Sequence, residues 1–185
     1  MSGPDLEGLR RLLLERSVRR GDFVLASGQR SSYYIDCRPT TMSAEGMVLI
    51  GRLGWAAIRA AGWQARAVGG LTMGADPVAY AVAAASWGTE LVLDAFSVRK
   101  EAKSHGTTRL IEGNFAPGDQ VVVTEDVITS GGSAKRAVEA VRAGGGDVAG
   151  VLAVVDRGQG GRQALEAEGL PVVALTTSAE LGLGA

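Results

Sequence analysis

The first forty residues show two different patterns of apolar positions. Four leucines recur with the spacing of one helical face: Leu6, Leu9, Leu12 and Leu13. This spacing predicts a helix, which we expect to end near Gly21. Short runs typical of strands follow at Phe23–Ala26 and Ser32–Asp36, on either side of a hairpin-like turn at residues 27–30. We expect residues 1–40 to form a small helix-plus-strands unit, called the hood below.

Residues 41–185 alternate between strand and helix patterns. The expected strands are Ala67–Gly70, Glu90–Val98, Val121–Thr124, Val148–Val155 and Val172–Leu175. The expected helices are Ser43–Ala61, Pro77–Ala85 and Ser133–Ala143. Such alternation predicts an α/β fold with a mainly parallel sheet flanked by helices. Ligands of these sheets bind at the carboxyl ends of the strands.

Composition narrows the class of protein. A length of 185 residues fits one compact domain, and 46% hydrophobic residues suffice for its core. The net charge of -1 gives no indication of a nucleic-acid or membrane-surface partner. No apolar run reaches the ~18 residues of a transmembrane helix, and the single cysteine, Cys37, suits a reducing compartment. We therefore expect a cytoplasmic protein.

The segment 121–133 carries the most chemical information. An apolar strand leads to Glu125 and Asp126, and a loop of hydroxyls and glycines then opens a helix. Unpaired amides at a helix N-terminus bind anions such as phosphate. The two acids could accept hydrogen bonds from neighbouring sugar hydroxyls, or stabilise positive charge on a sugar ring. The alternative is an acidic helix start with an ordinary glycine turn.

This segment resembles the phosphoribosyl pyrophosphate (PRPP)-binding motif of type I phosphoribosyltransferases, and it lacks the Lys of a P-loop. The resemblance implies that fold, with the hood at residues 1–40 and the phosphoribosyltransferase core at residues 41–185. It also implies that Glu125 and Asp126 hold the ribose hydroxyls. The residues implied to cradle the 5-phosphate are Thr129, Ser130, Gly131, Gly132 and Ser133, and Val127 and Ile128 are implied to belong to the same PRPP-binding segment.

A cluster of basic residues follows the strand that ends near Val98. It contains Arg99, Lys100, Lys103 and His105, the last being the only histidine. Taken alone, such a run could be a solvated face. Beside a phosphoribosyl site, cations could stabilise the departing diphosphate, and His105 could donate to its oxygen. The string resembles the catalytic loop of orotate phosphoribosyltransferases, which implies a homodimer with shared active sites and catalytic roles for Lys103, His105 and Asp126.

Three further segments match the same family. The string around Tyr33 and Tyr34 resembles its N-terminal signature, with Tyr34 implied to bind orotate; Ala26 stands where many relatives have Lys, and Ile35 where they have an aromatic residue. Arg157, at the end of an apolar strand, matches the base-binding arginine, and Thr129 also approaches the base. Thr72 lies in a loop resembling the one that binds pyrophosphate, although Met73 stands where many relatives carry Lys. Each tyrosine could instead simply pack, and the 69–77 loop could be a plain turn.

The resemblance implies transfer of the ribose 5-phosphate group from PRPP to orotate, giving orotidine 5'-monophosphate and diphosphate, in pyrimidine biosynthesis. It also implies Mg²⁺ held mainly by the substrate. No cluster of His, Cys or carboxylate side chains in the sequence has metal-ligand spacing. Two alternatives remain at this point: the same fold acting on another nucleobase, and a non-enzymatic regulator that senses a sugar phosphate.

Overall fold

The computed structural model describes residues 3–24, 30–101 and 110–184. The hood contains helix α1 (Pro4–Arg16), an antiparallel pair of strands, β1 (Val18–Val24) and β2 (Arg30–Ile35), and most of the short helix α2 (Arg38–Thr41). The four leucines of α1 are buried, as their spacing predicts. Helix α1 ends at Arg16, however, and not near Gly21. The chain leaves the helix at Ser17, whose carbonyl accepts the Asp36 amide (3.0 Å), because pairing with β2 replaces the next helical turn.

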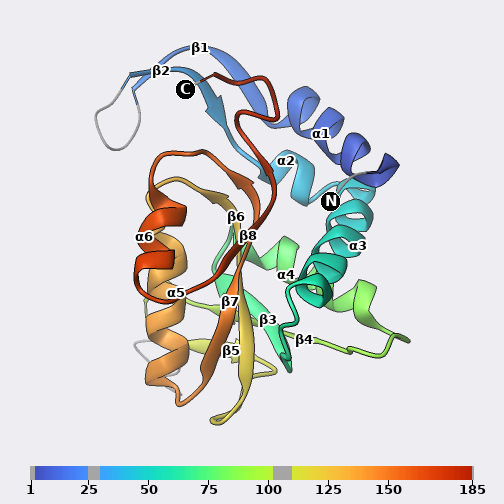
Figure 1. Cartoon of the computed structure of the whole chain (residues 1–185), viewed down its shortest axis with the longest axis vertical. Coiled ribbons are helices and arrows are strands. Elements are labelled where there is room, and N and C mark those ends of the chain that lie inside the picture. Colours follow the sequence, from blue (N-terminus) through green and yellow to red (C-terminus); the bar gives the residue numbers. More distant parts are fainter. Residues whose placement is uncertain (1–2, 25–29, 102–109, 185) are drawn as a thin grey trace.

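The core is a six-stranded sheet in the order β5-β4-β3-β6-β7-β8 (Figure 1). Its strands are β3 (Ala67–Leu71), β4 (Asp94–Val98), β5 (Ile111–Gly113), β6 (Gln120–Ile128), β7 (Asp147–Asp156) and β8 (Val172–Thr177). All neighbours run parallel except β5, which is antiparallel to β4. The predicted α/β fold with a mainly parallel sheet is thus confirmed. Helix α2, strand β5 and helix α6 (Gly161–Ala167) were not predicted.

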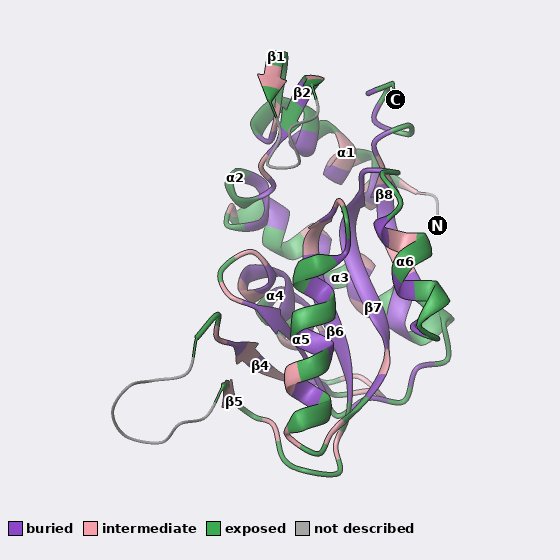
Figure 2. Ribbon diagram, turned by 90° about the vertical axis from the view of Figure 1, so that its left-hand side faces the viewer, coloured by how far each residue is buried: buried purple, intermediate pink, exposed green. Residues whose placement is uncertain are grey.

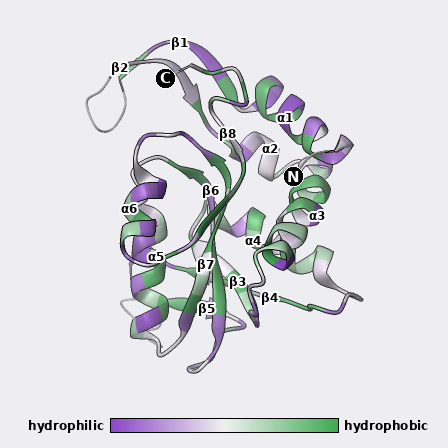
Figure 3. Cartoon of the chain, viewed as in Figure 1, coloured by the Kyte–Doolittle hydropathy of each residue, from purple (hydrophilic) through white to green (hydrophobic). Residues whose placement is uncertain are grey.

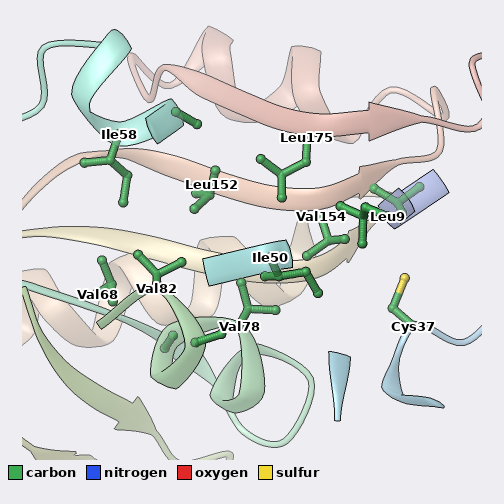
Figure 4. Packing of buried hydrophobic residues seen from close by; sticks show 14 of the residues in the cluster. Leu9, Cys37, Ile50, Ile58, Val68, Val78, Val82, Leu152, Val154 and Leu175 are labelled. Carbon is green, nitrogen blue, oxygen red and sulfur yellow. The ribbon is translucent and has the colours of Figure 1, made fainter. Parts of the chain in front are cut away.

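Helices cover both faces of this sheet. Residues of α3 (Ala44–Ala60) and α4 (Ala75–Ser86) pack on one face, in a cluster with Val68 and Leu152 (Figure 4). Residues of α5 (Gly132–Ala143) and α6 (Gly161–Ala167) pack on the other. Figure 2 shows the central strands buried, and Figure 3 shows β6, β7 and β8 as mostly hydrophobic. The two-sided cover explains why these strands read as continuous apolar runs.

Strand β6 is longer than its apolar run predicts. The expected strand stops at Thr124, whereas β6 continues through Glu125 and Asp126 to Ile128. The extension arises because β6 stays paired with β7 up to the Ile128–Asp156 pair. The two acids therefore lie on a rigid strand and not in a turn.

The strand order reverses between β3 and β6. The chain passes from β3 to β4 on one side, and from β6 to β7 on the other. In open α/β sheets such a switch point is where ligands bind, outside the carboxyl ends of the strands. The hood lies across these ends (Figure 1), held partly by the C-terminal segment, where Glu180 forms an ion pair with Arg10 of α1.

Candidate active site

A cavity of about 370 Å³ opens at this switch point. The hood contributes Tyr34, Ile35 and Asp36 to its wall, and Arg38 of α2 lies beside them. The remaining described lining residues come from the ends of β3, β4 and β6 and the start of α5: Leu71, Thr72, Met73, Gly74, Lys100, Glu125, Asp126, Val127 and Ser133. The structure thus brings together predicted residues from four separate segments of the sequence.

The two acids of β6 differ in environment. Glu125 is 6% exposed, and its Oε2 has no hydrogen-bond partner among the described residues. Burial, and secondly the neighbouring Asp126, raise the pKa of Glu125 well above its ordinary value. Asp126 is half-buried, and a Cβ at Gly74 would lie 2.7 Å from its Oδ1. The loop Leu71–Gly74 therefore packs directly on the Asp126 carboxylate, and a side chain at position 74 would require that carboxylate to shift.

The loop Thr129–Ser133, called the phosphate loop below, leads into α5. Gly131 is left-handed (φ 82°) and caps α5 without a side-chain hydrogen bond. The first amides of the helix, those of Gly132 and Ser133 among them, therefore have neither a carbonyl one turn earlier nor a side-chain cap. Ser130, Gly132 and Ser133 are exposed. This helix N-terminus has the geometry of a phosphate site. The Ile128 side chain is buried in the core.

Arg157 follows β7 and is 8% exposed. Its amide donates to the Ile128 carbonyl (3.0 Å), which fixes it beside the end of β6. Its Nε and Nη2 have no hydrogen-bond partner among the described residues, and its Cζ lies 5.0 Å from the centre of the Tyr33 ring. Asp156 is adjacent, but its Oδ1 accepts from the Gly158 amide (2.8 Å). A buried guanidinium with open donors suits a planar anion such as a carboxylate.

The two tyrosines of β2 face opposite ways, because neighbouring residues of a strand alternate. Tyr33 is buried beneath Arg157, and Tyr34 is 41% exposed, lines the cavity and lies 5.8 Å from the Phe23 ring. From the sequence, Tyr34 was predicted to bind the base, and no binding role was predicted for Tyr33. The alternation along β2 was the signal that could have separated them.

Two of the predicted cations, Arg99 and Lys100, lie within the described residues and have different partners. Lys100 lines the cavity, and its carbonyl accepts from Arg136 Nη2 (2.9 Å). Arg99 forms an ion pair with Glu112 of β5 (3.0 Å) and borders a neighbouring hollow. Lys103 and His105 lie outside the described residues. Thr72 lines the cavity; its amide donates to the Val98 carbonyl (2.8 Å).

One pair of lining residues was missed by the sequence argument. Asp36 Oδ1 accepts from the Arg38 amide (3.1 Å) and from Arg38 Nε (2.8 Å), and Asp36 Oδ2 accepts from Arg38 Nη2 (2.8 Å). These contacts lower the pKa of Asp36. Between them Cys37 is fully buried, and burial raises its thiol pKa well above the ordinary value. The Asp-x-Arg spacing at the end of a strand was the only available signal.

Neither a metal site nor a membrane-spanning helix is found within the described residues. No group of three or more His, Cys, Asp or Glu side chains in ranges 3–24, 30–101 and 110–184 is arranged to hold a metal ion. No helix within those ranges is long and apolar enough to cross a bilayer.

The fold and the site define the class of type I phosphoribosyltransferases. The mainly parallel sheet carries two acids beside its switch point, a helix N-terminus with the geometry of a phosphate site follows them, and the hood lies over the strand ends. Comparison with models of protein families finds no match. Curated relatives named orotate phosphoribosyltransferase include one from Mycobacterium avium, 47% identical with all of both chains covered. Another, from Rhodopirellula baltica, is 44% identical, with 97% of this chain and 95% of the relative covered. The chain belongs to the orotate phosphoribosyltransferase family.

Solved structures agree with this assignment. An orotate phosphoribosyltransferase from Mycobacterium tuberculosis, in complex with Fe(III) dicitrate, is 46% identical with a TM-score of 0.84, and the match covers 97% of this chain and 100% of that one. The same enzyme in complex with PRPP gives 43% identity and a TM-score of 0.81, again over 97% and 100%. A Trypanosoma brucei adenine phosphoribosyltransferase is 16% identical with a TM-score of 0.70, covering 96% of this chain and 81% of that one, and shares the fold alone.

Proposed function

We propose that this chain transfers the ribose 5-phosphate group from PRPP to orotate, giving orotidine 5'-monophosphate and diphosphate, and that it does so in the cavity described above. The observation that carries the proposal is Arg157: a buried guanidinium with open Nε and Nη2 donors, fixed beside the sugar-phosphate site. Orotate is a planar base with a carboxylate, and a fork of donors matches it. Adenine and hypoxanthine carry no carboxylate.

The bound substrate would extend across the switch point. The 5-phosphate would lie on the phosphate loop, where the amides of Gly132 and Ser133 and the hydroxyls of Thr129, Ser130 and Ser133 can donate. The ribose hydroxyls would lie at Glu125 and Asp126. The diphosphate would then reach the loop Leu71–Gly74 and Lys100, which line the same cavity. The base would lie between Arg157 and the hood, with Tyr34 and Thr129 beside it.

The reaction requires stabilisation of the charges that develop on the ribose and on the leaving diphosphate. The bond from the anomeric carbon to the diphosphate oxygen breaks, and its electron pair leaves with the diphosphate. The ring nitrogen of orotate forms the new bond with inversion and releases its proton to solvent. Positive charge develops on the ribose ring, where Asp126 and Glu125 can stabilise it. Negative charge develops on the leaving oxygen. We assign Lys103, Arg99 and Lys100 to that charge, and His105 to proton or hydrogen-bond donation.

Magnesium fits this arrangement as a companion of the substrate. The carboxylates of Glu125 and Asp126 line the cavity, and Mg²⁺ prefers oxygen donors while keeping several waters. We propose that diphosphate and ribose oxygens hold most of its coordination, with the two acids contacting it directly or through water. When bound, the ion supplies positive charge that partly neutralises the diphosphate.

The oligomeric state and the cellular compartment are proposed from the family and from the exposed apolar surface. We propose a homodimer with shared active sites, formed by a cytoplasmic protein. Adjacent helices α3 and α4, and Trp87 directly after α4, expose large apolar side chains that a partner would cover: Met47, Val48, Tyr80 and Trp87. Size-exclusion chromatography with light scattering should give about twice the 19.0 kDa chain mass, and a monomer at micromolar concentration would contradict the dimer.

The decisive experiment supplies PRPP and Mg²⁺ with orotate, uracil, hypoxanthine or adenine in parallel, and follows diphosphate release. We expect turnover with orotate and a far lower rate with the other three. Turnover of a purine without orotate would replace the assignment by another base specificity. Tight PRPP binding with no turnover of any base would indicate a sugar-phosphate sensor.

A further inference from the structure

The cavity wall carries few positive side chains among the described residues. Its described carboxylates are Asp36, Glu125 and Asp126, and its described cations are Lys100 and Arg38. Met73, 59% exposed, adds no charge to the loop that would meet the diphosphate. A polyanion bound here therefore needs nearby cations, and Arg38 is one that no part of the sequence argument assigned.

The contacts of Arg38 fix the direction of its guanidinium. Asp36 engages one edge, through Nε and Nη2, at 2.8 Å each. Asp36 is itself held at the end of β2, where its amide donates to the Ser17 carbonyl (3.0 Å). Within the described part of the chain, Arg38 Nη1 makes no hydrogen bond. A planar guanidinium held at one edge keeps its other edge available, and loses little freedom when it binds a second anion.

The ion pair does not cancel this capacity. The side chain of Arg38 is 51% exposed and that of Asp36 is 29% exposed. Exposed pairs are screened and contribute little on their own. Arginine can hold a carboxylate on one edge and a phosphate oxygen on the other, because its five donors point in different directions.

We propose that Arg38, oriented by Asp36, binds the diphosphate of PRPP and supplies from the hood the positive charge that Met73 lacks in the facing loop. This rests on the proposed function. It makes the hood a contributor to the diphosphate end of the site as well as to the base end. It also gives a role to the Asp36–Arg38 pair in the wall of the cavity that Thr72 and Met73 line as well.

The test compares Arg38→Ala, Arg38→Lys and the control Arg52→Ala, whose side chain lies on α3 outside the cavity lining. Calorimetry measures binding of inorganic diphosphate and, separately, of ribose 5-phosphate. Initial rates give KM for PRPP and for orotate. Melting temperatures check that each variant is folded.

For Arg38→Ala we expect about tenfold weaker diphosphate binding and a similar rise in KM for PRPP, the lower end for a lost charged hydrogen bond because the site is half-exposed. Ribose 5-phosphate binding and KM for orotate should change less than twofold. Arg38→Lys should recover part of the loss, and Arg52→Ala should match the unmodified chain. Unchanged diphosphate binding in folded Arg38→Ala, or an equal loss for ribose 5-phosphate, would overturn the inference.

The two proposals fail separately. If the unmodified chain does not turn over orotate, the proposed function fails, and the diphosphate titration still decides the role of Arg38. If the unmodified chain is active and Arg38→Ala behaves identically, the role of Arg38 alone is refuted.

Discussion

Replacing Arg157 by Met separates binding from stability more sharply than any other single change in the site. In the free enzyme, Arg157 is buried; among the described residues its Nε and Nη2 have no hydrogen-bond partner, and the Tyr33 ring lies against its guanidinium. An unsatisfied buried group costs about 1–3 kcal/mol, and the cation–π contact returns about 1 kcal/mol. Met fills similar volume without charge. The free energy of unfolding should therefore stay the same or rise by up to ~2 kcal/mol.

Orotate binding should respond in the opposite direction. Removing one member of a buried, hydrogen-bonded charge pair costs about 2–5 kcal/mol. At ~1.4 kcal/mol per factor of ten, kcat/KM for orotate should fall by between about 30-fold and about 4,000-fold. KM for PRPP should change little, because the phosphate loop and the two acids are untouched.

The assay pairs steady-state kinetics with urea unfolding, and uses Arg142→Met, at the exposed end of α5, as control. A threefold or smaller loss of kcat/KM for orotate would refute the assignment of Arg157 to the base. A drop in unfolding free energy of several kcal/mol would refute the claim that its donors are unpaired, because it would reveal a structural role.

Three more changes test other parts of the structure. Because burial raises the pKa of Glu125, the folded chain keeps that proton above the ordinary value of 4.5; stability should therefore fall as pH rises from there through the raised pKa. Glu125→Gln removes this penalty, so its advantage in urea unfolding should grow with pH, and a constant difference would contradict the raised pKa. Gly161→Ala should lower the free energy of unfolding by about 1–3 kcal/mol and weaken ribose 5-phosphate binding. The reason is that its Cβ would lie 2.5 Å from the Thr129 carbonyl oxygen and 2.7 Å from the Gly131 nitrogen. Gly184→Ala is the control, because no atom lies within 4 Å of a Cβ at that position. Leu152→Ala should lose about 2–5 kcal/mol with KM values unchanged in the folded protein, and a loss under 1 kcal/mol would mean that the core refills the space.

Pairing between strands that are distant in the sequence explains which elements of the fold could be predicted and which could not. The run Val148–Val155 predicted a strand buried on both faces, and β7 has that position. The end of α1 was misplaced because most of β1 is exposed and shows no alternating apolar pattern. What makes residues 18–24 a strand is a partner, β2, lying farther along the chain. The same holds for β5, which is only three residues long and exists by pairing with β4.

The site shows a similar division. Thr72, Lys100, Glu125, Asp126, Val127 and Ser133 could be named from motifs and do line one cavity. Arg38 could not, because a single cation among polar residues of the hood reaches the cavity only through the packing of α2 below β2. Ile128 was assigned to the PRPP-binding segment by its place in the motif, yet its side chain belongs to the core. A motif fixes where the backbone passes, and tertiary packing decides which side chains are available there.

The unpaired state of Arg157 bears directly on specificity. Uracil fits wherever orotate fits, since it lacks only the carboxylate, so shape alone cannot exclude it. In the free enzyme the guanidinium lies buried against Tyr33, and its Nε and Nη2 have no hydrogen-bond partner in the part of the chain that the structure describes. Uracil would close the pocket over those donors and leave them unsatisfied, whereas orotate would pair them. A site built to pair a polar group rejects the analogue that lacks it, because the buried partner is then stranded. Discrimination between orotate and uracil thus arises from a penalty already present in the free enzyme. The Arg157→Met variant should therefore lose most of this discrimination.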